Sequence, residues 1–119
     1  MVQKKTTIIP VDSCGVWNVQ IIHVYTKRRG KIGKIGEFFK ASVKSVRPKN
    51  WLAKKTKING ILVTTRKESY KIDGSWCVFK HNSGVLLKKG LQAFGAELLG
   101  PSVYELKRQK FINLFSGVV

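Results

Sequence analysis

Residues 60–86 read GILVTTRKESYKIDGSWCVFKHNSGVL, and they are the most informative part of the chain. Residues 61–65 are apolar and β-branched, which is typical of a β-strand, and residues 76–79 form a second run of the same kind. We expect these two runs to pair. Between them lies Asp73-Gly74, a dipeptide that tolerates the positive φ angles of a tight turn. The stretch therefore predicts a β-hairpin closed at Asp73-Gly74.

The same stretch contains a fixed set of spaced residues. Gly60 and three aliphatic residues are followed at set intervals by Asp73-Gly74, Phe79, Asn82 and Val85-Leu86. This pattern resembles the signature of the universal large-subunit ribosomal protein fourteen family. Because several spaced identities must coincide, the signal is specific.

The resemblance extends over nearly the whole chain. Further matching segments are Met1-Val2-Gln3, Asp12-Ser13-Cys14-Gly15, Lys44-Ser45-Val46-Arg47-Pro48, Gly100-Pro101, Glu105-Leu106 and Lys110-Phe111. The chain departs from the family at the first loop, where the family usually has Asp-Asn-Ser-Gly followed by a basic pair. Here Cys14 and Val16-Trp17-Asn18 occupy those places, so the family contacts of that loop are not transferred to this chain.

Composition leads to a compatible interpretation. A chain of 119 residues with 43% hydrophobic content fits a single domain, residues 1–119, with a modest core. Lysine and arginine outnumber aspartate and glutamate 23 to 6, which gives a formal net charge of +17. Such a charge repels itself unless a polyanion neutralises it, which favours nucleic acid over the alternative of a merely solvated basic surface. No apolar run approaches the length of a membrane-spanning helix, so we expect no membrane association.

Hydrophobic patterning predicts a mainly β fold. Residues 16–25 form a mostly apolar run, and residues 39–44 alternate strictly between apolar and polar side chains, which indicates one core face and one cationic face. With residues 8–9 and the strands of 60–87, about five strands predict a small five-stranded β-barrel over residues 1–90. The resemblance implies that a two-stranded hairpin projects from this barrel.

The pattern changes in residues 91–119, where we expect one or two short helices. Pro101 suits a first helical position, Glu105 suits the positive end of a helix, and cations follow toward Lys110. The predicted helix spans about residues 101–110. Its expected core anchors are Val103, Leu106 and Phe111.

Two basic segments interrupt the strands. Residues 27–36 combine five charges from lysine and arginine with three glycines, and glycine lets backbone N–H groups approach phosphate oxygens. Residues 47–57 are similarly basic and contain Trp51, which could stack on an unpaired base, worth ~1–3 kcal/mol, or could equally cap the core. Arg66, Lys67 and Lys71 lie on the expected hairpin, which in the family helps to hold ribosomal RNA. The candidate RNA-binding residues are Lys27, Arg28, Arg29, Lys31, Lys34, Lys44, Arg47, Lys49, Trp51, Lys54, Lys55, Lys57, Arg66, Lys67 and Lys71.

The resemblance implies a structural constituent of the large ribosomal subunit rather than an enzyme. Its implied partners are large-subunit ribosomal RNA, neighbouring large-subunit proteins, and small-subunit RNA across an intersubunit bridge. A ribosome-silencing factor is a further implied partner. The positions transferred to that surface are Tyr104, Lys107, Arg108 and Lys110. An alternative from the residues alone is a free barrel module that binds single-stranded nucleic acid, for which Trp51 or Tyr70 would serve as an aromatic platform.

Neither catalysis nor a cofactor is indicated. Six acidic residues, two separated histidines and no nucleophile motif leave little for acid–base chemistry. Cys14 and Cys77 lack the spacing of a zinc site, and we expect Cys77 to be a small buried hydrophobic residue. We expect structural, hydrogen-bonded roles for His23 and His81.

Residue usage bears on localisation. Eighteen lysines against five arginines suit an AT-rich genome. Together with the departures from the bacterial pattern, this bias predicts a ribosome in the mitochondrial matrix, with the bacterial cytoplasm or a plastid as alternatives. The resemblance begins at Met1, which predicts that no transit peptide precedes the domain.

Overall fold

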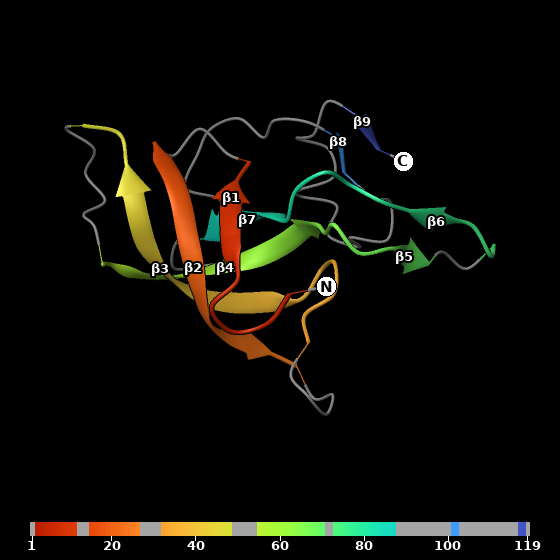
Figure 1. The fold of residues 1–119 in the computed structure, drawn as a ribbon, viewed down its shortest axis with the longest axis horizontal. Helices are drawn as coiled ribbons and strands as arrows, with labels where there is room; N and C mark the ends of the chain where they lie inside the picture. Colours follow the sequence, from red (N-terminus) through yellow and green to blue (C-terminus); the bar gives the residue numbers. More distant parts are fainter. Residues whose placement is uncertain are drawn as a thin grey trace.

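The computed structural model describes residues 2–11, 15–26, 32–48, 55–70, 73–87, 101–102 and 117–118. Within these residues the chain is mainly β. Five strands close a barrel (Figure 1): β1 (Thr7–Pro10), β2 (Val16–Tyr25), β3 (Phe38–Val46), β4 (Lys57–Thr64) and β7 (Ser83–Leu87). The predicted mainly β fold with a five-stranded barrel is confirmed.

The barrel strands follow the order β1-β2-β3-β4-β7. Neighbours pair antiparallel up to β7, which then pairs parallel with β1, where Ile9 lies opposite Ser83. Closure leaves no barrel strand with a free edge, and free edges promote aggregation. The barrel is therefore a rigid base for the segments that leave it.

A two-stranded ribbon, β5 (Ser69–Tyr70) and β6 (Trp76–Cys77), extends away from the barrel (Figure 1). The expected pairing of residues 61–65 with 76–79 is wrong for the barrel part. Residues 61–64 lie in β4, which pairs instead with β3 and β7. Their side chains are all buried, and a two-stranded ribbon has no core that could bury them. Between the two runs, the structure describes one backbone hydrogen bond: the Phe79 N–H donates to the Thr65 carbonyl at 3.3 Å.

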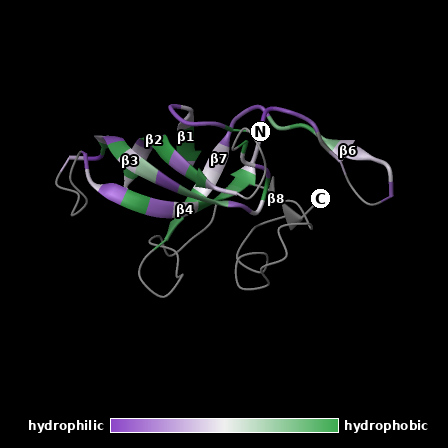
Figure 2. Ribbon diagram, turned by 90° about the horizontal axis from the view of Figure 1, so that it is seen from below, coloured by the Kyte–Doolittle hydropathy of each residue, from purple (hydrophilic) through white to green (hydrophobic). Residues whose placement is uncertain are grey.

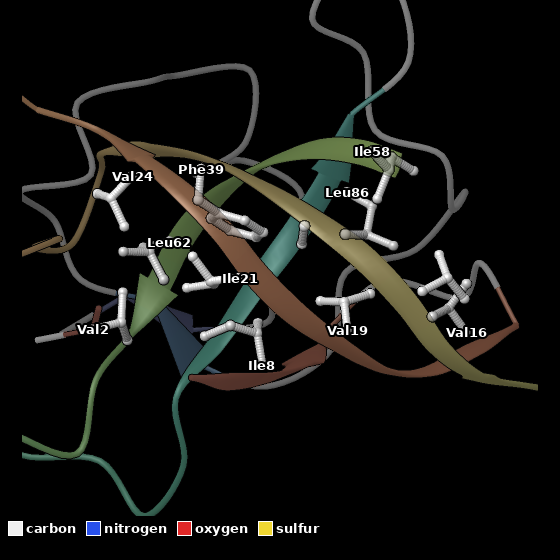
Figure 3. Close-up of a cluster of buried hydrophobic side chains, with 12 residues drawn as sticks. Val2, Ile8, Val16, Val19, Ile21, Val24, Phe39, Ile58, Leu62 and Leu86 are labelled. Atoms are coloured by element: carbon white, nitrogen blue, oxygen red, sulfur yellow. The ribbon is translucent and has the colours of Figure 1, made fainter. Parts of the chain in front are cut away.

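The core lies inside the barrel and is lined by alternate residues of its strands (Figure 3). In β3, Phe39, Ala41 and Val43 are fully buried while Lys40, Ser42 and Lys44 point outward, as their alternation predicts. Figure 2 shows hydrophobic and hydrophilic residues alternating along this strand. The opposite faces of β4 and β7 are buried as well, where Ile61, Val63, Val85 and Leu87 form a second cluster.

Strand β2 coincides with the predicted residues 16–25 but departs from a strict period of two. Its buried residues are Val16, Val19, Ile21 and Val24, so two of the three intervals are three residues long. The β2–β3 register shifts within each of these longer intervals. A β-bulge inserts one extra residue and reverses the phase of the side chains. This accounts for a run that looks incompletely amphipathic in the sequence.

The C-terminal part of the chain is described only as two short strands. β8 (Pro101–Ser102) pairs parallel with β9 (Gly117–Val118). Pro101 and Ser102 begin the predicted helix, but the rest of that helix lies outside the described residues, as do its anchors Val103, Leu106 and Phe111. Among the described residues, no helix is long and apolar enough to cross a membrane.

Candidate nucleic-acid interface

The projecting ribbon is fixed to the barrel by a buried polar cluster. Thr64 donates its hydroxyl hydrogen to the His81 carbonyl at 2.9 Å, and it shares a second hydrogen bond with the Ser83 hydroxyl. Next to it, the Asn82 side-chain carbonyl accepts a hydrogen bond from the Arg66 N–H at 2.9 Å. Both arms of the ribbon are therefore joined where they leave β4 and enter β7.

The far end of the ribbon is closed by the predicted turn. Gly74 has a φ of 92°, in the left-handed region that glycine adopts readily. The Asp73 carboxylate accepts hydrogen bonds from the Ser75 N–H at 3.1 Å and from the Ser75 hydroxyl at 2.7 Å. Such a side-chain bond to the backbone two residues on is typical of a turn. The prediction of a turn at Asp73-Gly74 is confirmed.

One group of cations lies at the start of β4. Lys57 is exposed and pairs across the strands with Ser42, which is on the outward face of β3 together with the exposed Lys44. Lys55 is also exposed and precedes β4, where its N–H donates to the Val43 carbonyl at 2.8 Å. Lys44 and Lys57 therefore share the outward face of the β3–β4 pair, and Lys55 lies two residues before Lys57.

A second group lies at the other end of β4. Arg66 and Lys67 are exposed at the base of the ribbon, and the Lys67 carbonyl accepts a hydrogen bond from the Thr65 hydroxyl at 3.0 Å. Lys34 is exposed in a turn beside the end of β4, where the Gly36 N–H donates to the Leu62 carbonyl at 2.8 Å. The two groups lie at opposite ends of β4, whose eight residues are seven steps of about 3.3 Å, so its ends are roughly 23 Å apart.

The described carboxylates are engaged locally. Glu37 accepts a hydrogen bond from the Lys34 N–H at 3.3 Å, and Glu68 accepts one from the Tyr70 hydroxyl at 3.0 Å. The Glu68 hydrogen bond and negative charge raise the pKa of Tyr70 above its usual value of 10.0. Among the described residues, no three His, Cys, Asp or Glu side chains are grouped to hold a metal ion.

Residues 1–118 match the family described as ribosomal protein L14p/L23e. The chain belongs to this family. It is also similar to the large ribosomal subunit protein uL14m of Tetrahymena pyriformis, with 44% identity over 119 residues and complete coverage of both chains. Family membership confirms the resemblance seen in residues 60–86 and gives the chain a structural, non-enzymatic role in the ribosome.

The similarity also bears on localisation. The suffix of the relative's name denotes the mitochondrial form, in agreement with the mitochondrial location predicted from residue usage. The L14 family match spans both the barrel and the segment that follows it.

The structure places only some of the sequence-predicted residues of this L14-family chain. Those that it describes and shows to be exposed are Lys34, Lys44, Arg47, Lys55, Lys57, Arg66 and Lys67. Those that lie outside the described residues are Lys27, Arg28, Arg29, Lys31, Lys49, Trp51, Lys54, Lys71, Tyr104, Lys107, Arg108 and Lys110. The choice between stacking and core packing for Trp51 therefore stays open.

Sequence reasoning omitted several surface residues from the candidate interface. Lys40 projects from the outward face of β3, a position that its alternation with Phe39 and Ala41 already indicated. Lys5 and Lys80 are exposed, but single lysines carry no pattern that would separate them from ordinary surface. Trp76 is exposed because β6 lies on the ribbon rather than in the barrel.

The expectations for Cys77 and for the two histidines also concern the surface. Cys77 was expected to be buried, but it is a free, partly exposed cysteine, because its strand pairs only with β5. His23 is partly exposed, and its ring packs edge-on against Tyr25 with ring centroids 4.9 Å apart. His81 is exposed, and its carbonyl accepts the Thr64 hydrogen bond.

Proposed function

We propose that this protein binds large-subunit ribosomal RNA by neutralising phosphates on the outer surface of the barrel and on the base of its ribbon. The observation that supports this proposal is the placement of Lys44 and Lys57 on the outward face of the β3–β4 pair, with the exposed Lys55 just before β4 and the exposed Arg66 and Lys67 beyond the other end of the same strand. Ammonium and guanidinium groups on a rigid surface attract phosphates and release counterions, without reading base identity.

The net charge of +17 supports this mechanism. An excess of cations that nothing in the chain balances destabilises the isolated fold, and a polyanion removes that cost. In the family, the protein lies at the subunit interface, contacts neighbouring large-subunit proteins and helps to form a bridge to small-subunit RNA. We extend these roles to this chain. Its work is then positioning and charge neutralisation during translation in the mitochondrial ribosome.

Binding of a silencing factor through Tyr104, Lys107, Arg108 and Lys110 stays a proposal from the family resemblance alone, because these residues lie outside the described part of the chain. It is tested by pull-down of a purified ribosome-silencing factor. Charge reversal of the three cations, Lys107, Arg108 and Lys110, is expected to abolish the interaction, whereas Lys44→Glu is expected to leave it intact.

Salt dependence tests phosphate neutralisation. If about six phosphates are contacted, affinity for ribosomal RNA is expected to fall about a thousandfold between about 50 and 200 mM salt. Replacing Lys44, Lys55 and Lys57 together with alanine is expected to weaken binding across RNA sequences and to make the salt dependence shallower by about one unit of logarithmic slope per lost contact. The matched control replaces the same residues with arginine, which keeps the charge and is expected to keep the slope. A response that does not change with salt would rule out the mechanism.

A free module for single-stranded nucleic acid is the competing function, and the exposed Tyr70 and Trp76 rings are the observation in its favour. Sedimentation of the native protein separates the two. A ribosomal protein sediments with large subunits at physiological salt, whereas a free module remains in the light fractions.

A further inference from the structure

The ribbon carries an aromatic pair at its end that the cationic mechanism does not use. Tyr70 and Trp76 are directly opposite each other in the β5–β6 register, so their side chains lie on one face of the ribbon. Their exposed fractions are 71% and 60%, the two highest among the described large hydrophobic residues. Most of the surface of each ring is therefore available to a partner.

The geometry of the pair leaves the ring faces open. The two ring centroids are 6.4 Å apart and the ring planes are inclined by 58°. A parallel stack would have covered one face of each ring, and this tilted arrangement does not. Val78, two residues beyond Trp76, is also exposed but has no aromatic ring on which a base could stack. Large aromatic side chains held in water on a two-stranded ribbon contribute little to folding, because such a ribbon has no core to bury them in.

We propose that Trp76 and Tyr70 form a stacking platform for an unpaired base of the ribosomal RNA. This rests on the proposed RNA-binding function and adds a second kind of contact to it. Aromatic rings accept any base because every base has a π-face, and sequence-specific proteins commonly target unstacked bases of RNA in this way. The exposed Arg66 and Lys67 at the ribbon base, with Lys80 on its other arm, attract the phosphates on either side of such a base.

The charges on the ribbon favour a base over a phosphate next to the aromatic pair. The Glu68 carboxylate is hydrogen-bonded to the Tyr70 hydroxyl, so a negative charge stands beside the aromatic pair. That charge repels a phosphate from this place, whereas a base carries no net charge. Cations at the ribbon base and an uncharged aromatic surface at its end therefore suit the phosphate and the base of one nucleotide strand.

The test compares full-length Trp76→Ala, Trp76→Phe and Val78→Ala proteins for binding to mitochondrial large-subunit ribosomal RNA over a range of salt concentrations. Loss of one stacked base is expected to reduce affinity between about fivefold and a hundredfold in Trp76→Ala. The salt slope is expected to remain that of the wild type, because no phosphate contact is lost. Trp76→Phe is expected to retain most of the affinity. Val78→Ala, which removes a neighbouring exposed apolar side chain, is expected to bind within about twofold of the wild type, because it loses no stacked base.

The outcomes also separate this proposal from the function on which it rests. Wild-type protein that shows no salt-dependent binding would overturn the proposed function itself. Salt-dependent wild-type binding with equal affinity in Trp76→Ala would overturn only the platform. So would a Trp76→Ala protein that binds RNA normally but fails to join the large subunit, since the occupant would then be a protein. All three variants are expected to melt at the wild-type temperature, because the substituted side chains are exposed.

Discussion

Lys5 and Lys55 occupy equivalent places in two β-bulges of the barrel. Each has a positive φ angle, 68° and 66°, and each is followed by a threonine. The N–H groups of Lys5 and Lys55 donate to the carbonyls of Ile21 and Val43, both at 2.8 Å. The opposite residue then donates its own N–H to the carbonyl of the threonine, at 2.9 Å and 3.0 Å. Two residues thus oppose one, which is the pattern of a bulge with its first residue in the left-handed conformation.

A third site shows which residue this geometry favours. Gly36, with a φ of 88°, and Glu37 oppose Leu62 through the same two hydrogen bonds. Glycine adopts that conformation without strain, whereas a residue with a Cβ atom is strained there by about 1–2 kcal/mol. Strained positions often coincide with functional sites. Lysine in place of glycine at these two positions therefore lowers the stability of the fold but supplies a positive charge. This fits a role in phosphate binding.

Substitution of Lys55 separates its charge from its conformation. Lys55→Gly is expected to be more stable than Lys55→Ala by about 1 kcal/mol, because glycine relieves the strain and alanine keeps it. Both variants lose the same charge and are expected to lose RNA affinity equally. Thermal unfolding and RNA titration measure the two effects. Lys57, in β4, is the control: there glycine is expected to be less stable than alanine by about 0.5–1 kcal/mol. The same order of stabilities at both positions would contradict the bulge assignment.

Packing against Phe39 explains a buried glycine in β4. A Cβ atom at Gly60 would lie 2.5 Å from Phe39 Cζ and 2.8 Å from the Val85 carbonyl oxygen. Gly60→Ala is therefore expected to cost about 1–3 kcal/mol of unfolding free energy, measured by denaturant titration. At Gly74, a Cβ atom would meet nothing within 4 Å, so Gly74→Ala is expected to strain only the local turn. Equal losses for the two variants would mean that the barrel tolerates repacking around Phe39.

The buried hydroxyl pair at the ribbon base leads to another prediction. Thr64→Val removes the partner of the Ser83 hydroxyl, which is buried, and leaves the His81 carbonyl without the Thr64 donor. The expected cost is about 1–3 kcal/mol in thermal unfolding. Thr64→Ser keeps the hydroxyl and is expected to restore most of the hydrogen-bond contribution. If Thr64→Val melts at the wild-type temperature, the ribbon is held to the barrel by other contacts.

The pKa of Tyr70 predicts a pH dependence confined to alkaline conditions. Its folded pKa is raised above 10.0 by Glu68, so any stabilisation from the Glu68–Tyr70 hydrogen bond is present below the unfolded pKa and lost as pH rises through the folded one. Glu68→Gln is expected to lower the pKa of Tyr70. Phenolate absorbance, taken as the difference from the corresponding Tyr70→Phe protein, isolates this residue from the other two tyrosines. An unchanged titration in Glu68→Gln would show that the hydrogen bond does not persist in solution.

Local sequence determined the strands and the turn of this protein. The alternation of Phe39, Ala41 and Val43 with polar residues fixes a half-buried strand, because successive side chains of a strand point to opposite faces. Asp73-Gly74 fixes a turn, because few other dipeptides adopt its geometry without strain. The spaced residues of the 60–86 stretch identified the family, and the charge identified the class of partner.

Which strands pair, and which side chains lie together, depends on the tertiary structure. Residues 61–64 and 76–77 are both strand-like. The first segment is buried in the barrel, where it lies between β3 and β7, whereas the second pairs with β5 on the ribbon. That difference leaves Trp76 exposed on the ribbon, opposite Tyr70. The bulge at Lys55 likewise depends on its pairing with Val43 in β3, which no local pattern indicates. Long-range pairing is settled by the burial of all strands together, and a single segment does not contain that information.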